Sequence, residues 1–446
     1  MIFKIYNSYS RKKEVFKPIS EDLIKMYVCG PTVYNDPHIG NARPAVVFDV
    51  LYRLLNLLYH NISYLRNITD IDDKINKEAQ KLNTTIDVIS SKYTKSYHED
   101  MYALNVLEPT HEPRATDHIN EIVNMIQGLI DKDYAYEAEA HVLFNVKSFK
   151  KYGVLSNRNL KEMVAGARVE VAPYKKNSHD FVLWKPSSSD LPGWDSPWGR
   201  GRPGWHIECS AMINKHLGSR IDIHGGGQDL IFPHHENEIA QSCCFNNNES
   251  FVNYWMHNGY LQIEGEKMSK SLGNILTVKD LTKQYDGEVI RLALLSTHYR
   301  KPINFSFSLL NQTKNVLDKL YRLVESSEFV MPKDFSINDI DKNVLSALCD
   351  DLNTPLAISN LLKLKDPEQL YKSANMLGIL KNKPNEWFSS LKESTISVEE
   401  IEEMIRDRNL ARERKDYEKA DLIRNRLLEE NIVLEDKGSE TIWKHK

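Results

Sequence analysis

The stretch LIKMYVCGPTVYNDPHIGN, residues 23–41, decides how this chain folds. Residues up to Cys29 are mostly apolar and predict a buried strand, and the turn that follows is rich in Gly, Pro, Asn and Asp. A helix is expected from near Asn41, with Pro44 in its first turn, and a second strand over residues 62–68. This β-α-β unit favours a parallel sheet that binds its ligand at the carboxyl ends of the strands.

Length and composition limit the possible classes of protein. A chain of 446 residues exceeds one hydrophobic core, so several domains are expected. The net charge of -4 excludes a globally basic nucleic-acid binder, although local basic patches remain possible. Five cysteines without a C-x-x-C pair argue against a disulfide framework. With no signal peptide and no apolar run of membrane-spanning length, we expect a cytoplasmic protein that does not enter a membrane.

The hydrophobic pattern changes along the chain and predicts a division into segments. After residue 112 the rhythm is broken by a helix over 118–132, by further strands and by a Pro/Gly/Trp-rich run, which indicates an insertion. The sheet resumes at 220–224, turns at the glycines after His224 and enters a helix near His234. From Leu309 onward the pattern is almost entirely helical.

We therefore expect an α/β protein whose catalytic domain is Rossmann-like and interrupted. Its expected parts are the first half of that domain (residues 1–112), the insertion (113–204), the second half (205–308), a helical bundle (309–400) and a small C-terminal domain (401–446). The last part interleaves many Arg and Lys residues with acids. Such a pattern fits a solvated helix face, and it also fits a surface that follows an RNA backbone.

Two short motifs suited to binding phosphate lie far apart in the chain. His38 and Asn41 stand at the start of the first helix, where backbone N–H groups and the helix dipole favour an anion. Lys267 and Lys270 lie in KMSKS, residues 267–271, between two glycines. Taken singly, these residues fit a turn histidine and a solvated loop. Together, the donors and cations indicate nucleotide activation, in which charge on phosphate must be stabilised.

A third group of residues offers metal ligands. Cys29 ends the first strand, Cys209 opens an expected helix, and His234 and Glu238 lie one helical turn apart. Thiolate, imidazole and carboxylate together suit Zn²⁺. Spacing alone, however, favours separate buried cysteines and a surface His/Glu pair.

These motifs resemble those of a known family. HIGN, in place of the commoner HIGH, and KMSKS are similar to the motifs of class I aminoacyl-tRNA synthetases. More specifically, the chain resembles the cysteinyl-tRNA synthetase family in several long stretches. They are residues 27–41 (YVCGPTVYNDPHIGN), 67–74 (NITDIDDK), 113–116 (PRAT), 180–185 (DFVLWK), 204–210 (GWHIECS), 224–238 and 416–427.

The resemblance implies roles for residues of this chain. His38, Asn41, Lys267 and Lys270 would be catalytic, and His38, Asn41, Gly226, Asp229 and Lys270 would bind ATP. Thr69, Trp205 and His224 would contact the amino acid. One Zn²⁺ would be held by Cys29, Cys209, His234 and Glu238, and His235 would lie beside these ligands or in the adenosine pocket. Mg²⁺ would accompany ATP.

The resemblance also implies a function. The chain would activate L-cysteine with ATP and transfer it to the terminal ribose of tRNA(Cys), as a monomer. The insertion would guide the acceptor end and the tail would recognise the anticodon. A cysteine:amino-sugar ligase and a non-catalytic RNA-binding paralogue are the alternatives. The tail departs from the family pattern at residues 435–441 (EDKGSET), so anticodon contacts are not assigned there.

Overall fold

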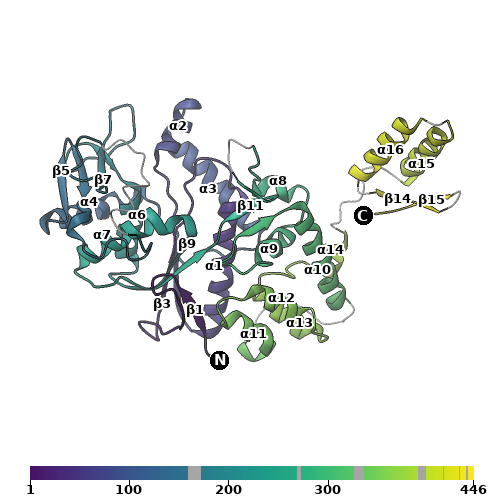
Figure 1. Ribbon diagram of the computed structural model, residues 1–446, viewed down its shortest axis with the longest axis horizontal. Helices are drawn as coiled ribbons and strands as arrows, with labels where there is room; N and C mark the ends of the chain where they lie inside the picture. Colours follow the sequence, from purple (N-terminus) through teal and green to yellow (C-terminus); the bar gives the residue numbers. More distant parts are fainter. Residues whose placement is uncertain are drawn as a thin grey trace. The chain divides into compact units, whose positions relative to one another are not determined.

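The computed structural model divides the chain into two compact units, Met1–Lys381 and Asn382–Lys446 (Figure 1). It describes residues 1–158, 172–268, 273–325, 336–389, 398–414, 416–430, 432–437 and 440–445. The backbone of Lys267 is among them, but its side chain is not. Within these ranges, no helix has the length and apolar character needed to cross a membrane.

A four-stranded parallel sheet forms the centre of the first unit. In sheet order, its strands are β10 (Val252–Asn258), β9 (Ile221–Gly227), β3 (Ile24–Val28) and β4 (Ile62–Arg66). Tyr27 of β3 pairs with His224 of β9. This pairing confirms that residues before and after the insertion form one sheet.

The first β-α-β unit is present, but its helix begins earlier than predicted. Helix α1 spans Ile39–Leu58, and His38 is its N-cap. Pro44 therefore lies in the second turn and not the first, so the Gly40 carbonyl cannot receive the usual helical N–H from residue 44. The early start follows from the cap, because the side chains of His38 and Asn41 satisfy backbone N–H groups there.

The turn predicted over residues 225–229 is present but begins later, because β9 continues to Gly227 and a short helical turn, Gln228–Leu230, follows it. Gly225, Gly226 and Gly227 are the last residues of β9. A Cβ on Gly225 would lie 2.3 Å from the Phe48 ring, and one on Gly226 would lie 2.9 Å from the His235 ring. The strand uses glycine here because aromatic rings pack directly on its backbone.

The insertion shares a hydrophobic core with the segment that follows it, because Ile126 and Phe144 cluster with Ile207 and Ala240. Its helix α4 (Ile119–Asp131) packs against a four-stranded antiparallel sheet, and Figure 1 shows both beside helices α6 (Trp205–His216) and α7 (Glu236–Asn246). The sheet consists of β5 (Ala135–Ala138), β6 (His141–Phe144), β7 (Phe181–Pro186) and β8 (Gly201–Pro203).

Smaller elements complete the catalytic part of the first unit. They are the hairpin β1 (Lys4–Asn7) and β2 (Lys12–Val15), helices α2 (Asp73–Lys81), α3 (Ile86–Ala103), α8 (Val278–Thr282) and α9 (Gly287–Leu295), and strands β11 (Leu261–Ile263), β12 (Glu266–Lys267) and β13 (Ile303–Phe305). The last three form a small sheet in the order β12-β11-β13.

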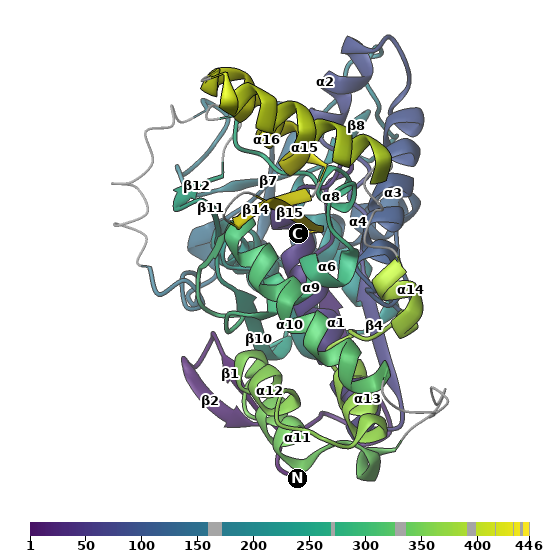
Figure 2. The ribbon, with the colours of Figure 1, turned by 90° about the vertical axis from the view of Figure 1, so that its right-hand side faces the viewer.

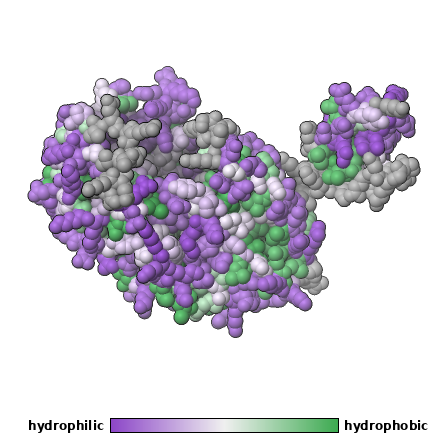
Figure 3. Space-filling view, viewed as in Figure 1, coloured by the Kyte–Doolittle hydropathy of each residue, from purple (hydrophilic) through white to green (hydrophobic). Residues whose placement is uncertain are grey.

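Helices close the first unit. They are α10 (Phe307–Glu325), α11 (Lys342–Cys349), α12 (Thr354–Leu361) and α13 (Pro367–Asn375). Figures 1 and 2 both place α11 and α12 next to the β1–β2 hairpin, where the Tyr6 N–H donates to Asp351 at 2.8 Å. In Figure 3, apolar side chains gather on the visible surface over α10 and α12.

The described elements from α10 onward are helical, as expected, except that the second unit also contains a hairpin, which the expectation did not include. The elements of the second unit are α14 (Pro384–Ser389), α15 (Val398–Glu413), α16 (Tyr417–Glu429), β14 (Ile432–Lys437) and β15 (Glu440–His445). Ile432 and Leu434 of β14 pack against Ile401, Ile405 and Leu427 of the helices. The alternating apolar residues of β14 complete a core that two charged helices could not close alone.

Candidate active site

His38 and Asn41 hold each other in a capping box at the start of α1. The Asn41 N–H donates to His38 Nδ1 at 3.2 Å, and the His38 N–H donates to Asn41 Oδ1 at 3.2 Å. The orientation of both side chains is therefore set by the helix end. Backbone N–H groups and the positive end of the helix dipole face the same region, which suits a phosphate.

Met268 and the chain that follows the KMSKS stretch lie against this helix start. After the stretch, the Ile39 N–H donates to the Leu276 carbonyl at 2.9 Å, and the Val278 N–H donates to the Pro37 carbonyl at 3.0 Å. Within the stretch itself, Met268 lies so close that a Cβ added to Gly40 would be 2.9 Å from Met268 Cε. The two motifs, distant in sequence, thus meet in space.

Of the two lysines of the second motif, the structure describes only the backbone of Lys267. The Lys267 backbone ends β12, where it pairs with Gln262 of β11. Lys270 and its neighbours, residues 269–272, lie outside the described residues. The cationic side of the nucleotide site therefore remains a prediction.

A buried arginine joins α1 to the small sheet that carries Lys267. Arg43 is 1% exposed, and its guanidinium donates to the carbonyls of Gly259, Tyr260, Tyr299 and Lys301 at 2.6–3.3 Å. Gly259 and Tyr260 precede β11, and the other two precede β13. The helix of the first motif and the base of the second are thus fixed to each other.

The four predicted metal ligands converge on one point. The ligand atoms of Cys29, Cys209, His234 and Glu238 all lie within 4.8 Å of one another. The two sulfurs are 3.9 Å apart, and His234 Nε2 lies 3.0 Å from Glu238 Oε1. Cys209, His234 and Glu238 are at most 2% exposed.

The elements explain this convergence. Cys29 directly follows β3, so it lies at the carboxyl edge of the parallel sheet. Cys209 lies in the second turn of α6, not at its start as predicted. His234 stands in the short helical turn Ile231–His235, and Glu238 stands in the first turn of α7.

Electrostatics show that the cluster is built for a cation. Burial acts to raise the pKa of Glu238, but His224 and His234 outweigh it and lower this pKa to about 2. Burial acts to lower the pKa of His234, but Glu238 and Cys209 raise it to about 10. The hydrogen bond from Cys29 lowers the pKa of Cys209 to about 6. The anionic forms of Cys209 and Glu238 are thus favoured at one place, which suits a divalent cation.

A second possible ligand set overlaps the first. Cys29, His224, His235 and Glu238 also bring their ligand atoms within 4.8 Å of one another. His235 Nε2 lies 3.4 Å from the Cys29 sulfur, and His224 Nε2 lies 2.8 Å from Glu238 Oε2. His235 is therefore an alternative to His234 as the imidazole ligand. The contact with His224 orients the Glu238 carboxylate.

Two histidines that the sequence did not assign support the cluster. His206 Nδ1 lies 2.9 Å from His234 Nδ1, and burial lowers the pKa of His206 to about 3, so its neutral ring accepts a hydrogen bond from His234. His257 Nε2 lies 2.8 Å from His235 Nδ1 in the same way. His206 lies within the GWHIECS stretch, which was a signal for it, whereas His257 had none in the sequence.

The residues predicted to contact the amino acid lie around the cluster. The Trp205 indole is 40% exposed and stacks on His234 with ring centroids 4.4 Å apart. The Thr69 hydroxyl is buried and accepts a hydrogen bond from Asn67 at 3.1 Å. Their roles toward a substrate stay predictions, as does that of His224.

The residues predicted for adenosine lie at the end of β9. Gly226 faces the His235 ring, as described above. The Asp229 carboxylate lies over Gly227, where a Cβ would approach Asp229 Oδ1 to 2.3 Å. Contacts of Gly226 and Asp229 with ATP stay predictions.

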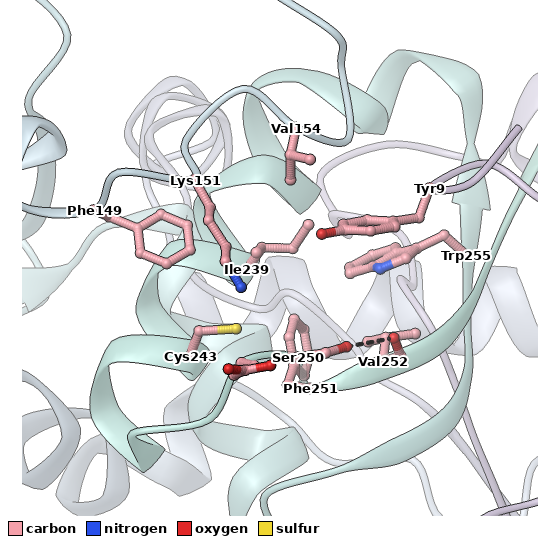
Figure 4. Close-up of a pocket in the computed structure, with 11 residues that line it drawn as sticks. Tyr9, Phe149, Lys151, Val154, Ile239, Cys243, Ser250, Phe251, Val252 and Trp255 are labelled. Atoms are coloured by element: carbon pink, nitrogen blue, oxygen red, sulfur yellow. Dashed lines mark hydrogen bonds between the residues drawn. The ribbon is translucent and has the colours of Figure 1, made fainter.

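A shallow crevice lies behind the cluster (Figure 4). Its lining includes Tyr9, Ile239, Cys243 and Trp255, and it contains none of the predicted site residues. Trp255 separates the two, because its indole also stacks on His224 with centroids 4.6 Å apart. The crevice therefore adjoins the cluster across Trp255.

Comparisons with known proteins agree with this geometry. The family model of the tRNA synthetases class I (C) catalytic domain matches residues 15–315. A cysteine--tRNA ligase from Saccharophagus degradans is 53% identical, with 100% of each chain covered. One from Paramagnetospirillum magneticum is 52% identical, with 99% of each chain covered.

Solved structures match the fold at low identity. Methionyl-tRNA synthetase from Mycobacterium tuberculosis, in complex with methionyl-adenylate, has a TM-score of 0.59 at 14% identity, covering 79% of this chain and 83% of that one. A ternary complex of LeuRS, tRNA and LeuAMS from Agrobacterium radiobacter has a TM-score of 0.54 at 11% identity, covering 81% and 83%. With the family model and the full-length relatives, these findings show that the chain belongs to the cysteine--tRNA ligase family of class I tRNA synthetases.

Proposed function

We propose that the chain catalyses the two steps of cysteine--tRNA ligation. In the first, the carboxylate of L-cysteine attacks the α-phosphorus of ATP, which forms cysteinyl adenylate and releases pyrophosphate. In the second, a hydroxyl of the terminal ribose of tRNA(Cys) attacks the activated carbonyl and AMP leaves. The observation that carries the proposal is the buried thiol, imidazole and carboxylate cluster at the same sheet edge as the His38 motif.

The geometry of the capping box indicates what the first motif contributes. His38 Nδ1 accepts a hydrogen bond from the Asn41 N–H, so the neutral ring carries its own proton on Nε2. Asn41 Oδ1 is likewise occupied, which leaves its amide N–H₂ as the donor. We assign both groups to phosphate oxygens, where negative charge grows as pyrophosphate departs.

The remaining nucleotide contacts are assigned by position in the family motifs. Lys267 and Lys270 would supply positive charge from the other side of the triphosphate, and Gly226 and Asp229 would meet the adenosine. Mg²⁺ would accompany ATP and neutralise phosphate charge. Positioning and charge stabilisation would carry the rate, with no general base required.

The cluster fits a zinc ion, and its ligands would be Cys29, Cys209, His234 and Glu238. Their mixture of sulfur, nitrogen and oxygen donors, gathered in a buried site, is the set that Zn²⁺ accepts. A Zn²⁺ bound there would favour the sulfur of cysteine over the oxygen of serine. The chain itself holds the site dry, orients His234 through His206, and covers it with Trp205.

Domain roles follow from the same resemblance. Residues 113–204 would guide the acceptor end, 309–400 would form the supporting bundle, and 401–446 would read the anticodon. Catalysis would be divided between 1–112 and 205–308. We further propose a cytoplasmic monomer.

Cysteine-dependent exchange of pyrophosphate into ATP tests the first step, and charging of tRNA(Cys) tests the second. Activity in both assays is expected, with serine exchanged far more slowly than cysteine. Absence of cysteine-dependent exchange in zinc-replete protein would refute the proposal and favour the non-catalytic RNA-binding paralogue.

The cysteine:amino-sugar ligase shares the first step, so the second step must separate it. The full chain should charge tRNA(Cys) and should not consume an amino sugar. The relatives named cysteine--tRNA ligase match over the whole chain, the second unit included, which favours the tRNA reading. Transfer to an amino sugar without tRNA charging would reverse that choice.

A further inference from the structure

Asn67 is a buried amide that touches three parts of the amino-acid site. It follows β4, is 1% exposed, and was not assigned a role above. Its Oδ1 accepts from the Gly30 N–H at 2.9 Å and lies 3.9 Å from the Cys209 sulfur. Its Nδ2 donates to the Thr69 hydroxyl at 3.1 Å. The Asn67 side chain therefore contacts Gly30, which follows the ligand Cys29, and it also contacts the ligand Cys209 and the predicted substrate contact Thr69.

The orientation of this amide is determined by its neighbours. Gly30 offers only an N–H at this position, so the oxygen of Asn67 must face it and the N–H₂ must face Thr69. The absence of a side chain at Gly30 lets the two segments approach this closely, because a Cβ there would lie 1.6 Å from the backbone carbonyl oxygen of Asn67. The Thr69 N–H is also bound, to the Pro31 carbonyl at 3.1 Å.

This orientation sets the polarity of the Thr69 hydroxyl. A hydroxyl has one proton to donate and lone pairs to accept with. Because Asn67 donates to the Thr69 oxygen, the Thr69 proton cannot point back toward Asn67. It is held ready for an acceptor elsewhere. Free cysteine offers an ammonium, a thiol and a carboxylate. The ammonium only donates and the sulfur is a weak acceptor, so the carboxylate is the strong acceptor for this proton.

We propose that Asn67 is a positioning residue that fixes Thr69 as a donor to the carboxylate of the bound amino acid. The inference rests on the proposed function, since it takes L-cysteine as the ligand. In this arrangement the Thr69 hydroxyl donates to the ligand and does not accept from it. This accounts for an amide, and not a carboxylate, at position 67. An aspartate would accept where Asn67 donates, and it would draw the Thr69 proton away from the ligand.

The test is the substitution Asn67→Asp, which keeps an acceptor for Gly30 and reverses the hydrogen bond to Thr69. Binding of L-cysteine to the zinc-loaded full chain is measured by calorimetry, beside cysteamine, which has the thiol and amine but no carboxylate. We expect L-cysteine to bind about 10–100-fold more weakly, as for a lost hydrogen bond to a charged group. Cysteamine binding and zinc content should change by less than about twofold, since the thiol contact is unaltered.

Two further variants make the result decisive. Thr69→Val removes the hydroxyl, and adding Asn67→Asp to it should weaken cysteine binding no further, because the two residues act as one unit. Asn105→Asp is the matched control, since it deletes a comparable amide donor, to the Gly378 carbonyl at 2.8 Å, and should leave both ligands unaffected.

Equal weakening of L-cysteine and cysteamine, or additive losses in the double variant, would overturn the proposal. Loss of zinc in Asn67→Asp would also overturn it, because the effect would then belong to the cluster. Failure of the proposed function is separate, since wild-type protein would then show no cysteine-dependent exchange at all.

Discussion

The two halves of the proposed active site are built in opposite ways. The cluster around Glu238 combines side chains from separate elements, and Cys209, His234 and Glu238 are buried. His224 holds Glu238 in place, and His206 holds His234. The nucleotide motifs instead use the half-buried start of a helix and backbone contacts between two chain segments. The contrast indicates that selection of the amino acid depends on side-chain packing, whereas phosphate binding depends on the start of α1 and on the segment bonded to it. Substitutions should therefore separate the two functions.

The largest separation is expected from Cys29→Ser. Replacing a thiol ligand removes a soft donor from the cluster, so the protein should lose its metal and most of its preference for cysteine over serine. The fall in cysteine-dependent exchange should exceed the about 10–100-fold typical of changes behind the ligands. Metal content and exchange with each amino acid measure this.

A matched control lies on the same helix as Glu238. Cys243 is 3% exposed and belongs to neither possible ligand set. Cys243→Ser should retain metal and selectivity. Full retention of both in Cys29→Ser would refute the ligand assignment.

Lys270→Ala should produce the reverse pattern. Loss of one cation that stabilises departing pyrophosphate should lower kcat for exchange by about 10²–10³, while metal content and cysteine binding stay unchanged. Lys283→Ala removes a surface lysine paired with Asp280 at 2.7 Å and should have no such effect. If Lys270→Ala lowered metal content as well, the two halves would not be independent.

Glu288 extends the comparison to a second buried glutamate. Burial, with repulsion from Asp286, raises the pKa of Glu288 to about 7, despite hydrogen bonds from Tyr321 and two backbone N–H groups. A raised pKa contributes stability that is present below the unfolded value, near 4.5, and is lost as pH rises through 7.

Glu288→Gln should therefore remove part of the pH dependence of folding. Between pH 4.5 and 7, the free energy of unfolding should fall by about 2 kcal/mol more in the wild type than in the variant. Urea unfolding across this range measures the difference. Parallel pH profiles would contradict the assignment.

The smallest effect is expected from Gly40→Ala. The added methyl would lie 2.9 Å from Met268 Cε and 3.0 Å from His38 Nδ1, so both must shift. An overpacking cost of about 1 kcal/mol corresponds to a KM for ATP about fivefold to tenfold higher, with metal retained. Gly128→Ala, which crowds Phe245 at 2.6 Å, should lower stability without changing the KM for ATP.

Much of this architecture could be predicted from the sequence. The apolar run before Cys29 and the helical spacing after Asn41 predicted the β-α-β unit, because these patterns arise from local periodicity. The resemblance to a known family then gathered Cys29, Cys209, His234 and Glu238, and the structure places their ligand atoms together. Spacing alone favoured the opposite reading, since ligands from separate elements have no common period.

The misses have physical causes. The glycines after His224 signalled a turn, but they continue β9 because Phe48 and His235 pack on its backbone. The hairpin of the tail was missed because its strands are stabilised by the helices they pack on. His257 gave no signal, since its contact with His235 depends on the tertiary fold.

The His38 capping box has a consequence for anyone who studies this protein through its variants. The ring that we assign to phosphate also caps the start of α1, so replacing it removes a ligand contact and an N-cap at once. Serine is a preferred N-cap residue, so it would keep the cap and remove the phosphate contact. Comparing the kinetic constants of the alanine and serine variants would therefore separate the effect of losing the phosphate contact from the effect of losing the cap.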